Sequence, residues 1–176
     1  IISSCPHVCR ALREQYAVLG IAFPPLPVLH TAEFLAEEVE AGRISLAALN
    51  IDAAGYHDPC HLGRKLGIFD EPRKLIRSAT GSVPLELFHN RESAECCGAG
   101  SVMLVTEPEL ARKVARRRME NVRQEGIKTL ITACGNCKTL LLGAEEAVKG
   151  GIAVMDIAEL VAAALRDQEK SEKNRE

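Results

Sequence analysis

Apolar residues along this chain form short runs with strand-like character, each followed by a longer run with helical spacing. The strand-like runs lie at 53–57, 84–88, 129–133 and 152–155. The helical stretches begin near Glu71 in the first case and span 108–124, 138–148 and 156–166 in the others. Strands that alternate with helices pair in parallel through right-handed crossovers. The pattern therefore predicts an α/β fold, an open and mostly parallel sheet with flanking helices in Rossmann-like layers.

The first 50 residues depart from this alternation. We expect a strand end, a cysteine turn and a helix over residues 1–16, then a proline-rich connector from Phe23 to Pro27. Next come a short extended segment at 28–30 and a helix that Thr31 caps and that ends near Gly42. Because the chain begins without methionine on IISSCP, typical of a buried strand end, we expect a piece of a longer polypeptide.

Charge and composition exclude several function classes. The formal net charge is −2, without the basic surplus that a nucleic-acid binder needs. No apolar run approaches the roughly 20 residues of a membrane span, and the first residues lack the basic, apolar and small-residue order of a signal peptide, so we expect a soluble, cytoplasmic segment. We expect Asp156 to be the N-cap of the last helix. The charged residues 167–176 that follow this helix should be disordered.

Seven cysteines without an export signal indicate metal binding or redox chemistry rather than a disulfide framework. Five of them follow strands of the predicted sheet, and parallel strands bring such loops to one edge. The adjacent pair Cys96-Cys97 follows Cys60 after 35 residues. After 36 more residues comes Cys134, which forms a CxxC motif with Cys137. Thiolates select zinc, copper(I) or iron-sulfur clusters. Adjacent side chains in extended backbone point to opposite faces, so the pair Cys96-Cys97 favours a centre with several metal atoms over a single zinc ion. Zinc and purely structural thiols remain as alternatives.

Two features around the cysteines suit an anionic centre. Gly98 and Gly100, in the motif ECCGAG, permit positive φ and let backbone amides approach sulfur. The helix after Cys137 places its N-terminal amides beside the CxxC pair.

Other polar residues allow two interpretations each. His57, Asp58 and His61 flank Cys60 and either assist the chemistry, as hydrogen-bond or proton donors, or brace the turn. The basic run from Arg112 to Arg118 lies opposite an apolar helix face and is either solvated or a docking site for an acidic redox partner.

The cysteine spacing, with YHDPCHLGR around Cys60 and ECCGAG around the adjacent pair, resembles the cysteine-rich CCG domain of the heterodisulfide reductases and related iron-sulfur oxidoreductases. Relatives commonly carry two such domains, and SCPHVCRALREQY resembles the end of a preceding one. The resemblance divides the chain into a remnant of that repeat (1–22), a connector and helix (23–50), a complete CCG domain (51–166) and the tail (167–176).

The resemblance implies a non-cubane 4Fe-4S cluster bound by the five cysteines Cys60, Cys96, Cys97, Cys134 and Cys137, with zinc as the alternative. It implies an electron-transfer role beside a flavoprotein or ferredoxin-type module, in some relatives linked to membrane quinone. A thiol-disulfide switch at Cys96-Cys97 or Cys134-Cys137 is a further hypothesis. Cys5 and Cys9 form CxxxC where the family usually has CxxC, which puts a second site there in doubt.

Overall fold

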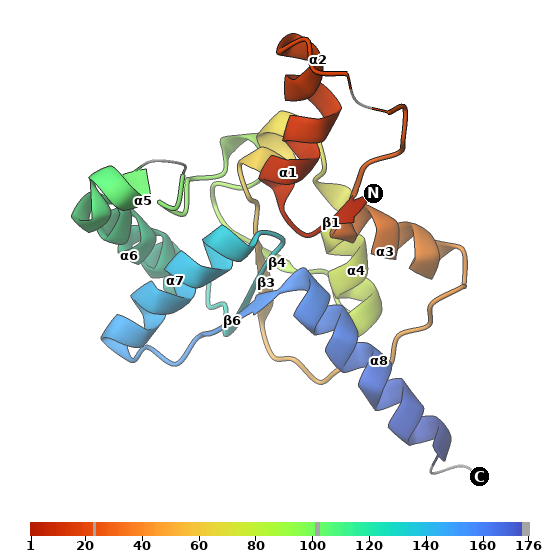
Figure 1. The fold of residues 1–176 in the computed structure, drawn as a ribbon. Coiled ribbons are helices and arrows are strands. Elements are labelled where there is room, and N and C mark those ends of the chain that lie inside the picture. Colours follow the sequence, from red (N-terminus) through yellow and green to blue (C-terminus); the bar gives the residue numbers. More distant parts are fainter. Residues whose placement is uncertain (23, 101–102, 174–176) are drawn as a thin grey trace.

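A four-stranded parallel sheet forms the centre of the protein, as the computed structural model of residues 1–22, 24–100 and 103–173 shows (Figure 1). Its strands are β3 (Ala54–His57), β4 (Leu85–Glu86), β5 (Thr129–Thr132) and β6 (Ala153–Asp156), in the order β4-β3-β5-β6. All pairs are parallel, with Tyr56 opposite Glu86 in β4 and Ile131 in β5. The predicted α/β fold is confirmed.

Helices cover both faces of the sheet. Helices α3 (Thr31–Glu40), α4 (Asp70–Thr80) and α8 (Ile157–Lys173) lie on one side, and α6 (Pro108–Gln124) and α7 (Gly135–Val148) on the other (Figure 1). Leu130 and Ile131 are neighbours in β5, yet they belong to separate hydrophobic clusters, one on each face. Because strand side chains alternate, a sheet buried on both faces gives the nearly continuous apolar run seen in the sequence.

The N-terminal segment forms a separate layer at one end. Strands β1 (Ile2–Ser3) and β2 (Leu29–His30) make a two-stranded parallel sheet. Between them, α1 (Pro6–Arg10) continues through a π-helical turn, η1 (Ala11–Gln15), into α2 (Tyr16–Val18). Helix α1 packs against the π-helical turn η2 (His61–Lys65) that follows β3. The remaining short elements are η3 (Arg91–Ser93) and α5 (Met103–Thr106).

Several element boundaries differ from the predictions. His30, not Thr31, is the N-cap of α3, because its Nδ1 accepts from the Ala32 N–H while the Glu33 carboxylate accepts from the His30 N–H. Helix α7 begins at Gly135 rather than Lys138. Strand β4 is shorter than 84–88, since the chain turns away after Glu86 and Asn90 donates to the Leu87 carbonyl.

The last helix is longer than the 156–166 expected from the sequence. Helix α8 continues to Lys173, and the segment 167–173 is rich in Glu, Gln and Lys, which are good helix formers. The Asp156 side chain accepts from the Ala158 N–H, which confirms the predicted N-cap. Residues 174–176 lie outside the described part of the chain. Among the described residues, no helix combines the length and apolar character that crossing a membrane requires.

Candidate metal centre

The five cysteines of the predicted site meet in one pocket at the carboxyl edge of the sheet. Cys60 follows β3, Cys96 and Cys97 lie in the loop after β4, and Cys134 and Cys137 lie at the start of α7, after β5. The space between them, including the open mouth, is about 290 Å³. Other residues that line it include His7, His61 and Asn136. The predicted convergence of the cysteine loops is confirmed.

The five thiols are linked to one another in sequence. Cys97 donates a hydrogen bond to Cys137, and the thiols of Cys60 and Cys96, of Cys96 and Cys97, and of Cys134 and Cys137 shift each other's pKa values. The sulfurs of Cys97 and Cys137 are 3.1 Å apart, longer than the roughly 2.05 Å of a disulfide bond, and all seven cysteines are free. Donor groups from three separate loops therefore already share one site.

A tight turn lets the two adjacent cysteines enter the same pocket. The Gly98 N–H donates to the Cys96 sulfur at 3.3 Å, and the Ala99 N–H donates to the Cys97 sulfur at 3.4 Å. Gly98 has φ +91°, and a Cβ at this residue would lie 2.4 Å from the Ala111 carbonyl oxygen. Only glycine fits such a position. Gly100 shows no positive φ, so the expectation for that glycine is not met.

Within this network, two thiols favour the thiolate. The Cys60 and Cys97 hydrogen bonds lower the pKa of Cys96 far below its ordinary value, while the same contact with Cys96 raises the pKa of Cys60. The pKa of Cys134 falls to about 7, because Cys137 hydrogen-bonds to it and backbone N–H groups at the start of α7 donate to it. The pKa values of Cys97 and Cys137 are raised, chiefly by their neighbouring thiols and by burial, so Cys96 and Cys134 are the members of the set that favour the thiolate, the metal-binding form of cysteine.

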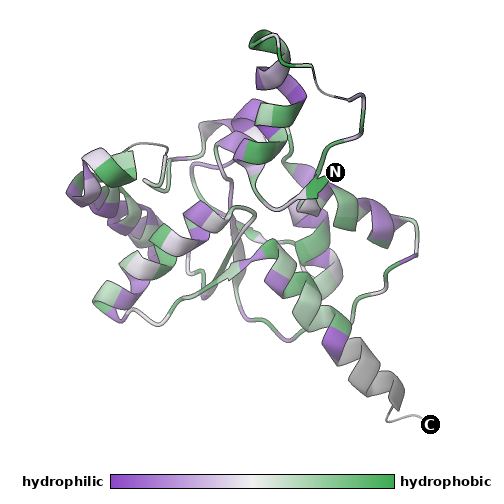
Figure 2. Ribbon diagram, in the orientation of Figure 1, coloured by the Kyte–Doolittle hydropathy of each residue, from purple (hydrophilic) through white to green (hydrophobic). Residues whose placement is uncertain are grey.

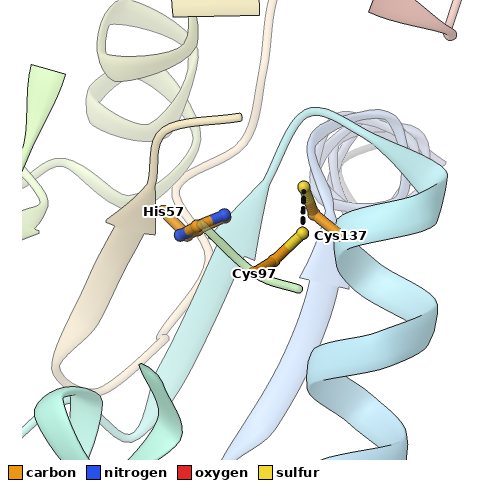
Figure 3. A group of neighbouring side chains, drawn as sticks. All are labelled: His57, Cys97 and Cys137. Atoms are coloured by element: carbon orange, nitrogen blue, oxygen red, sulfur yellow. Dashed lines mark hydrogen bonds between the residues drawn. The ribbon is translucent and has the colours of Figure 1, made fainter. Parts of the chain in front are cut away.

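His57 lies at the inner wall of the site. A ring nitrogen of this buried side chain is within 4.8 Å of the sulfurs of Cys97 and Cys137, and Figure 3 shows the ring projecting from the end of β3 toward them. Burial, together with the nearby Arg118 guanidinium, lowers the pKa of His57 to about 3. The imidazole is therefore neutral at physiological pH.

Arg118 is a buried residue whose role the sequence pattern did not indicate. Lys113 and Arg117 of the basic run are exposed, as both interpretations of the run require, but Arg118 is only 1% exposed. Its Nε donates to His57 Nδ1 at 3.3 Å, and Nη2 donates to the His89 carbonyl at 2.9 Å. The sequence signal that could have indicated its burial is spacing: Arg118 follows the buried Ala111 by seven residues, which places both on one face of α6. The rest of this helix is coloured mostly hydrophilic in Figure 2.

Asp58 and His61, the other two polar residues that flank Cys60, have different surroundings. Asp58 braces the turn, because Arg73 binds both of its carboxylate oxygens, at 2.8 and 2.9 Å, and the Arg91 N–H donates to it. His61 lies at the mouth of the pocket, with Nδ1 3.5 Å from the Cys60 sulfur. Its ring stacks on His7 of α1 at 3.7 Å between centroids, a contact that the sequence did not predict.

Cys5 and Cys9 do not join the five. Neither of them lines the pocket, although His7 between them does. Cys9 is fully buried, and its sulfur lies 3.7 Å from the carbonyl oxygens of Ser3 and Leu29. Burial raises its pKa. In this chain Cys9 packs as a neutral thiol.

The donor set fits a thiolate-bound metal cluster. Five thiols, two backbone N–H groups aimed at sulfur and a helix N-terminus are the ligands and surroundings that stabilise an anionic iron-sulfur centre. His57 supplies a further polar group, since one of its ring nitrogens is within 4.8 Å of the Cys97 and Cys137 sulfurs and its buried Nε2 has no hydrogen-bond partner among the described residues.

Comparisons with known proteins agree with this chemistry. The model of the CCG cysteine-rich domain family matches residues 54–141, which contain all five cysteines. The chain is 33% identical over 165 residues to a subunit of the dihydromethanophenazine:CoB–CoM heterodisulfide reductase from Methanosarcina barkeri, covering 94% of this chain and 40% of that protein. It is 32% identical over 168 residues to a subunit of the CoM/CoB fumarate reductase from Methanothermobacter marburgensis, covering 95% and 32%.

A third relative is the EtfAB:quinone oxidoreductase of Syntrophomonas wolfei, 31% identical over 174 residues, which cover 92% of this chain and 23% of that protein. The chain thus spans 40% or less of the length of these three relatives. The family model covers half of the chain and includes every thiol of the pocket. The chain belongs to the CCG cysteine-rich domain family.

Proposed function

We propose that this chain is an iron-sulfur electron-transfer subunit, or part of one, in an oxidoreductase of the heterodisulfide reductase type. In this proposal Cys60, Cys96, Cys97, Cys134 and Cys137 hold a non-cubane 4Fe-4S cluster. When bound, the cluster supplies one-electron transfer.

The observation that supports this best is the way the adjacent cysteines divide. Cys96 and Cys97 interact with each other, but Cys96 also interacts with Cys60, whereas Cys97 donates to Cys137, whose thiol interacts with Cys134. A single tetrahedral ion takes four ligands and would leave one thiol of this set unused. The thiols thus form two groups, Cys60 with Cys96 and Cys97 with Cys134 and Cys137, which the adjacent residues Cys96 and Cys97 join. This arrangement suits a centre with several metal atoms.

The protein residues bind, screen and polarise such a centre. Cys97, Cys134 and Cys137 are each less than 5% exposed, so the inner part of the site excludes water. The N–H groups of Gly98 and Ala99 donate to sulfur and stabilise negative charge there. Cys60 and His61 occupy the mouth, which is the side from which a partner or substrate reaches the site.

Redox partners are part of the proposal. The three relatives are named as subunits of a heterodisulfide reductase and a fumarate reductase and as an EtfAB:quinone oxidoreductase. By analogy, electrons reach this chain from a flavoprotein or a ferredoxin-type module and leave toward a disulfide substrate or a quinone-linked membrane partner.

Zinc is the second candidate, and a specific group of residues favours it. His57, Cys97 and Cys137 have ligand atoms within 4.8 Å of one another, and Cys134 adjoins them, as a Cys₃His zinc site would require. Against it, Arg118 donates to His57 Nδ1, which places the imidazole proton on Nε2. A protonated nitrogen cannot coordinate a metal, and moving the proton to Nδ1 to free Nε2 would set two N–H donors, His57 Nδ1–H and Arg118 Nε–H, against each other.

Metal analysis of the anaerobically purified chain tests the proposal. We expect about four iron and four acid-labile sulfide per chain after reconstitution, with visible absorption that bleaches on reduction. Cys96→Ala and Cys97→Ala each should lose most of this iron, whereas Cys5→Ala, which removes a thiol outside the pocket, should retain it. Stoichiometric zinc without sulfide would overturn the proposal, and a metal-free chain with a reversible dithiol would favour the thiol-disulfide switch.

A further inference from the structure

Arg118 is an unbalanced positive charge in the protein interior. Among the described residues, no carboxylate lies within ion-pair distance of its guanidinium, and Nη1 has no hydrogen-bond partner. The nearest acidic groups are engaged elsewhere, since Asp58 binds Arg73, and Glu95 accepts from Asn121 and pairs with Arg117. Burying a cation without a counter-charge is costly. Glu95 and Asp58 act on Arg118 only from beyond ion-pair distance, so a further negative charge beside it would stabilise the buried guanidinium.

The thiol pocket is where that negative charge can form. Arg118 contacts His57, and His57 lies within 4.8 Å of the sulfurs of Cys97 and Cys137. Metal thiolates in this pocket carry negative charge, and in a buried site opposite charges interact strongly. Arg118 thus lies on the far side of His57 from the pocket, and a single side chain separates its guanidinium from the cysteine sulfurs.

The contact with Arg118 also fixes how His57 faces the site. A guanidinium has only donors, so His57 Nδ1 must accept, and the proton of the neutral ring resides on Nε2. Nε2 has no other partner among the residues that the structure describes. The ring extends toward Cys97 and Cys137 (Figure 3), so this free N–H is available to a sulfur atom.

We propose that Arg118 and His57 form a positioning pair for the metal centre: Arg118 supplies fixed positive charge and holds His57 so that its Nε2–H donates to sulfur in the pocket. This rests on the proposed function. Both effects stabilise added negative charge, so the pair favours the reduced state of the centre and raises its reduction potential.

The test compares reduction potentials of anaerobically reconstituted variants, followed by EPR during redox titration. In Arg118→Met and in His57→Leu, we expect the equilibrium constant for one-electron reduction to fall by about tenfold or more, which corresponds to 59 mV for each factor of ten. The effect of the double variant should be smaller than the two single effects combined, because removing Arg118 also releases His57 from its position. Arg117→Met, which removes an exposed charge from the neighbouring position, should leave the potential at the wild-type value.

Stability supplies a readout that does not depend on the activity of the loaded protein. With metal-free, reduced chain, Arg118→Met should unfold at the same temperature as wild type or higher, because it removes an uncompensated buried charge. In the reconstituted chain the same variant should unfold at least about 3 °C lower than wild type. A side chain with a purely structural role would change both states in the same direction.

The outcomes separate this inference from the proposed function. If the wild-type chain takes up no iron, the proposed function fails and this inference fails with it. If iron is bound and neither variant shifts the potential, the inference alone is overturned. Should Arg118→Met fail to fold, His57→Gln decides: its amide keeps an N–H donor and should retain the wild-type potential, whereas equal potentials for His57→Gln and His57→Leu would overturn the inference.

Discussion

At Gly98 the backbone turns so tightly that two consecutive cysteine side chains enter one pocket. Its φ of +91° and the Ala111 carbonyl 2.4 Å from the missing Cβ mean that a side chain is strained there in two ways. We expect Gly98→Ala to lower the free energy of unfolding of the metal-free chain by about 2 kcal/mol or more, measured by urea denaturation. Loading with iron should fall as well, because the Cys96 and Cys97 sulfurs move.

Gly100 is the matched control for this substitution. It lies two residues away in the same loop, it shows no positive φ, and a Cβ there meets no atom within 4 Å. Gly100→Ala should therefore change the free energy of unfolding by no more than about 0.5 kcal/mol. Equal losses from the two substitutions would mean that the turn at Gly98 is not what holds the cysteine pair.

Single residues of the site differed in how predictable they were. The five cysteines could be recognised because each follows a strand, and Gly98 because adjacent thiols need an unusual turn. The sequence placed Arg118 in an exposed basic run, either solvated or a docking site, because its neighbours in sequence are charged. Its spacing in sequence from Ala111 and Val122 places it on the buried face of α6, but nothing in the sequence showed that His57 would accept its hydrogen bond.

At the level of elements, Arg73 ties α4 to the edge of the sheet. Its guanidinium binds the carboxylate of Asp58, after β3, and that of Glu86, in β4. Asp58 is 2% exposed, so removing its partner leaves a buried charge whose remaining donor is the Arg91 N–H. We expect Arg73→Met to lower the free energy of unfolding by about 3 kcal/mol, measured by urea denaturation.

Lys74 offers a control at the next position of α4. Its ion pair with Glu40 has both side chains about half exposed, and such pairs contribute roughly 0–1 kcal/mol. Lys74→Met should therefore be nearly neutral. A loss as large as that of Arg73→Met would show that charge on α4, rather than the buried link between elements, accounts for the effect.

The order of the elements was predictable, whereas several of their ends were not. Periodicity located all four strand-helix units, because each helix has a face buried on the sheet. The boundaries depend on local contacts that periodicity does not contain. His30 caps α3 through its ring nitrogen, and α7 starts early enough to place Cys137 in its first turn. The stretch 167–173 extends α8 although its charge suggested disorder.

On the scale of the whole molecule, the pocket is where the two hydrophobic cores meet. Cys97, Cys134 and Cys137 belong to the cluster beneath α6 and α7, while the loop with Cys60 leads to Leu62, which belongs to the cluster on the other face. The sequence predicted that these loops converge, since parallel strands end at one edge. It did not predict that α1 covers this edge through the contact between His7 and His61, because that contact joins segments with no shared pattern.

A centre bound by all five thiols would join the loops after three strands, and hydrogen exchange can detect this. We expect metal loading to slow exchange together in the segments 59–65, 96–100 and 134–138, because a ligand that binds only the folded site suppresses local opening there. Peptides from α3, which contributes no ligand, should exchange at similar rates with and without metal. Protection confined to 96–100 and 134–138, with 59–65 unchanged, would contradict a five-thiol centre and indicate a site that excludes Cys60.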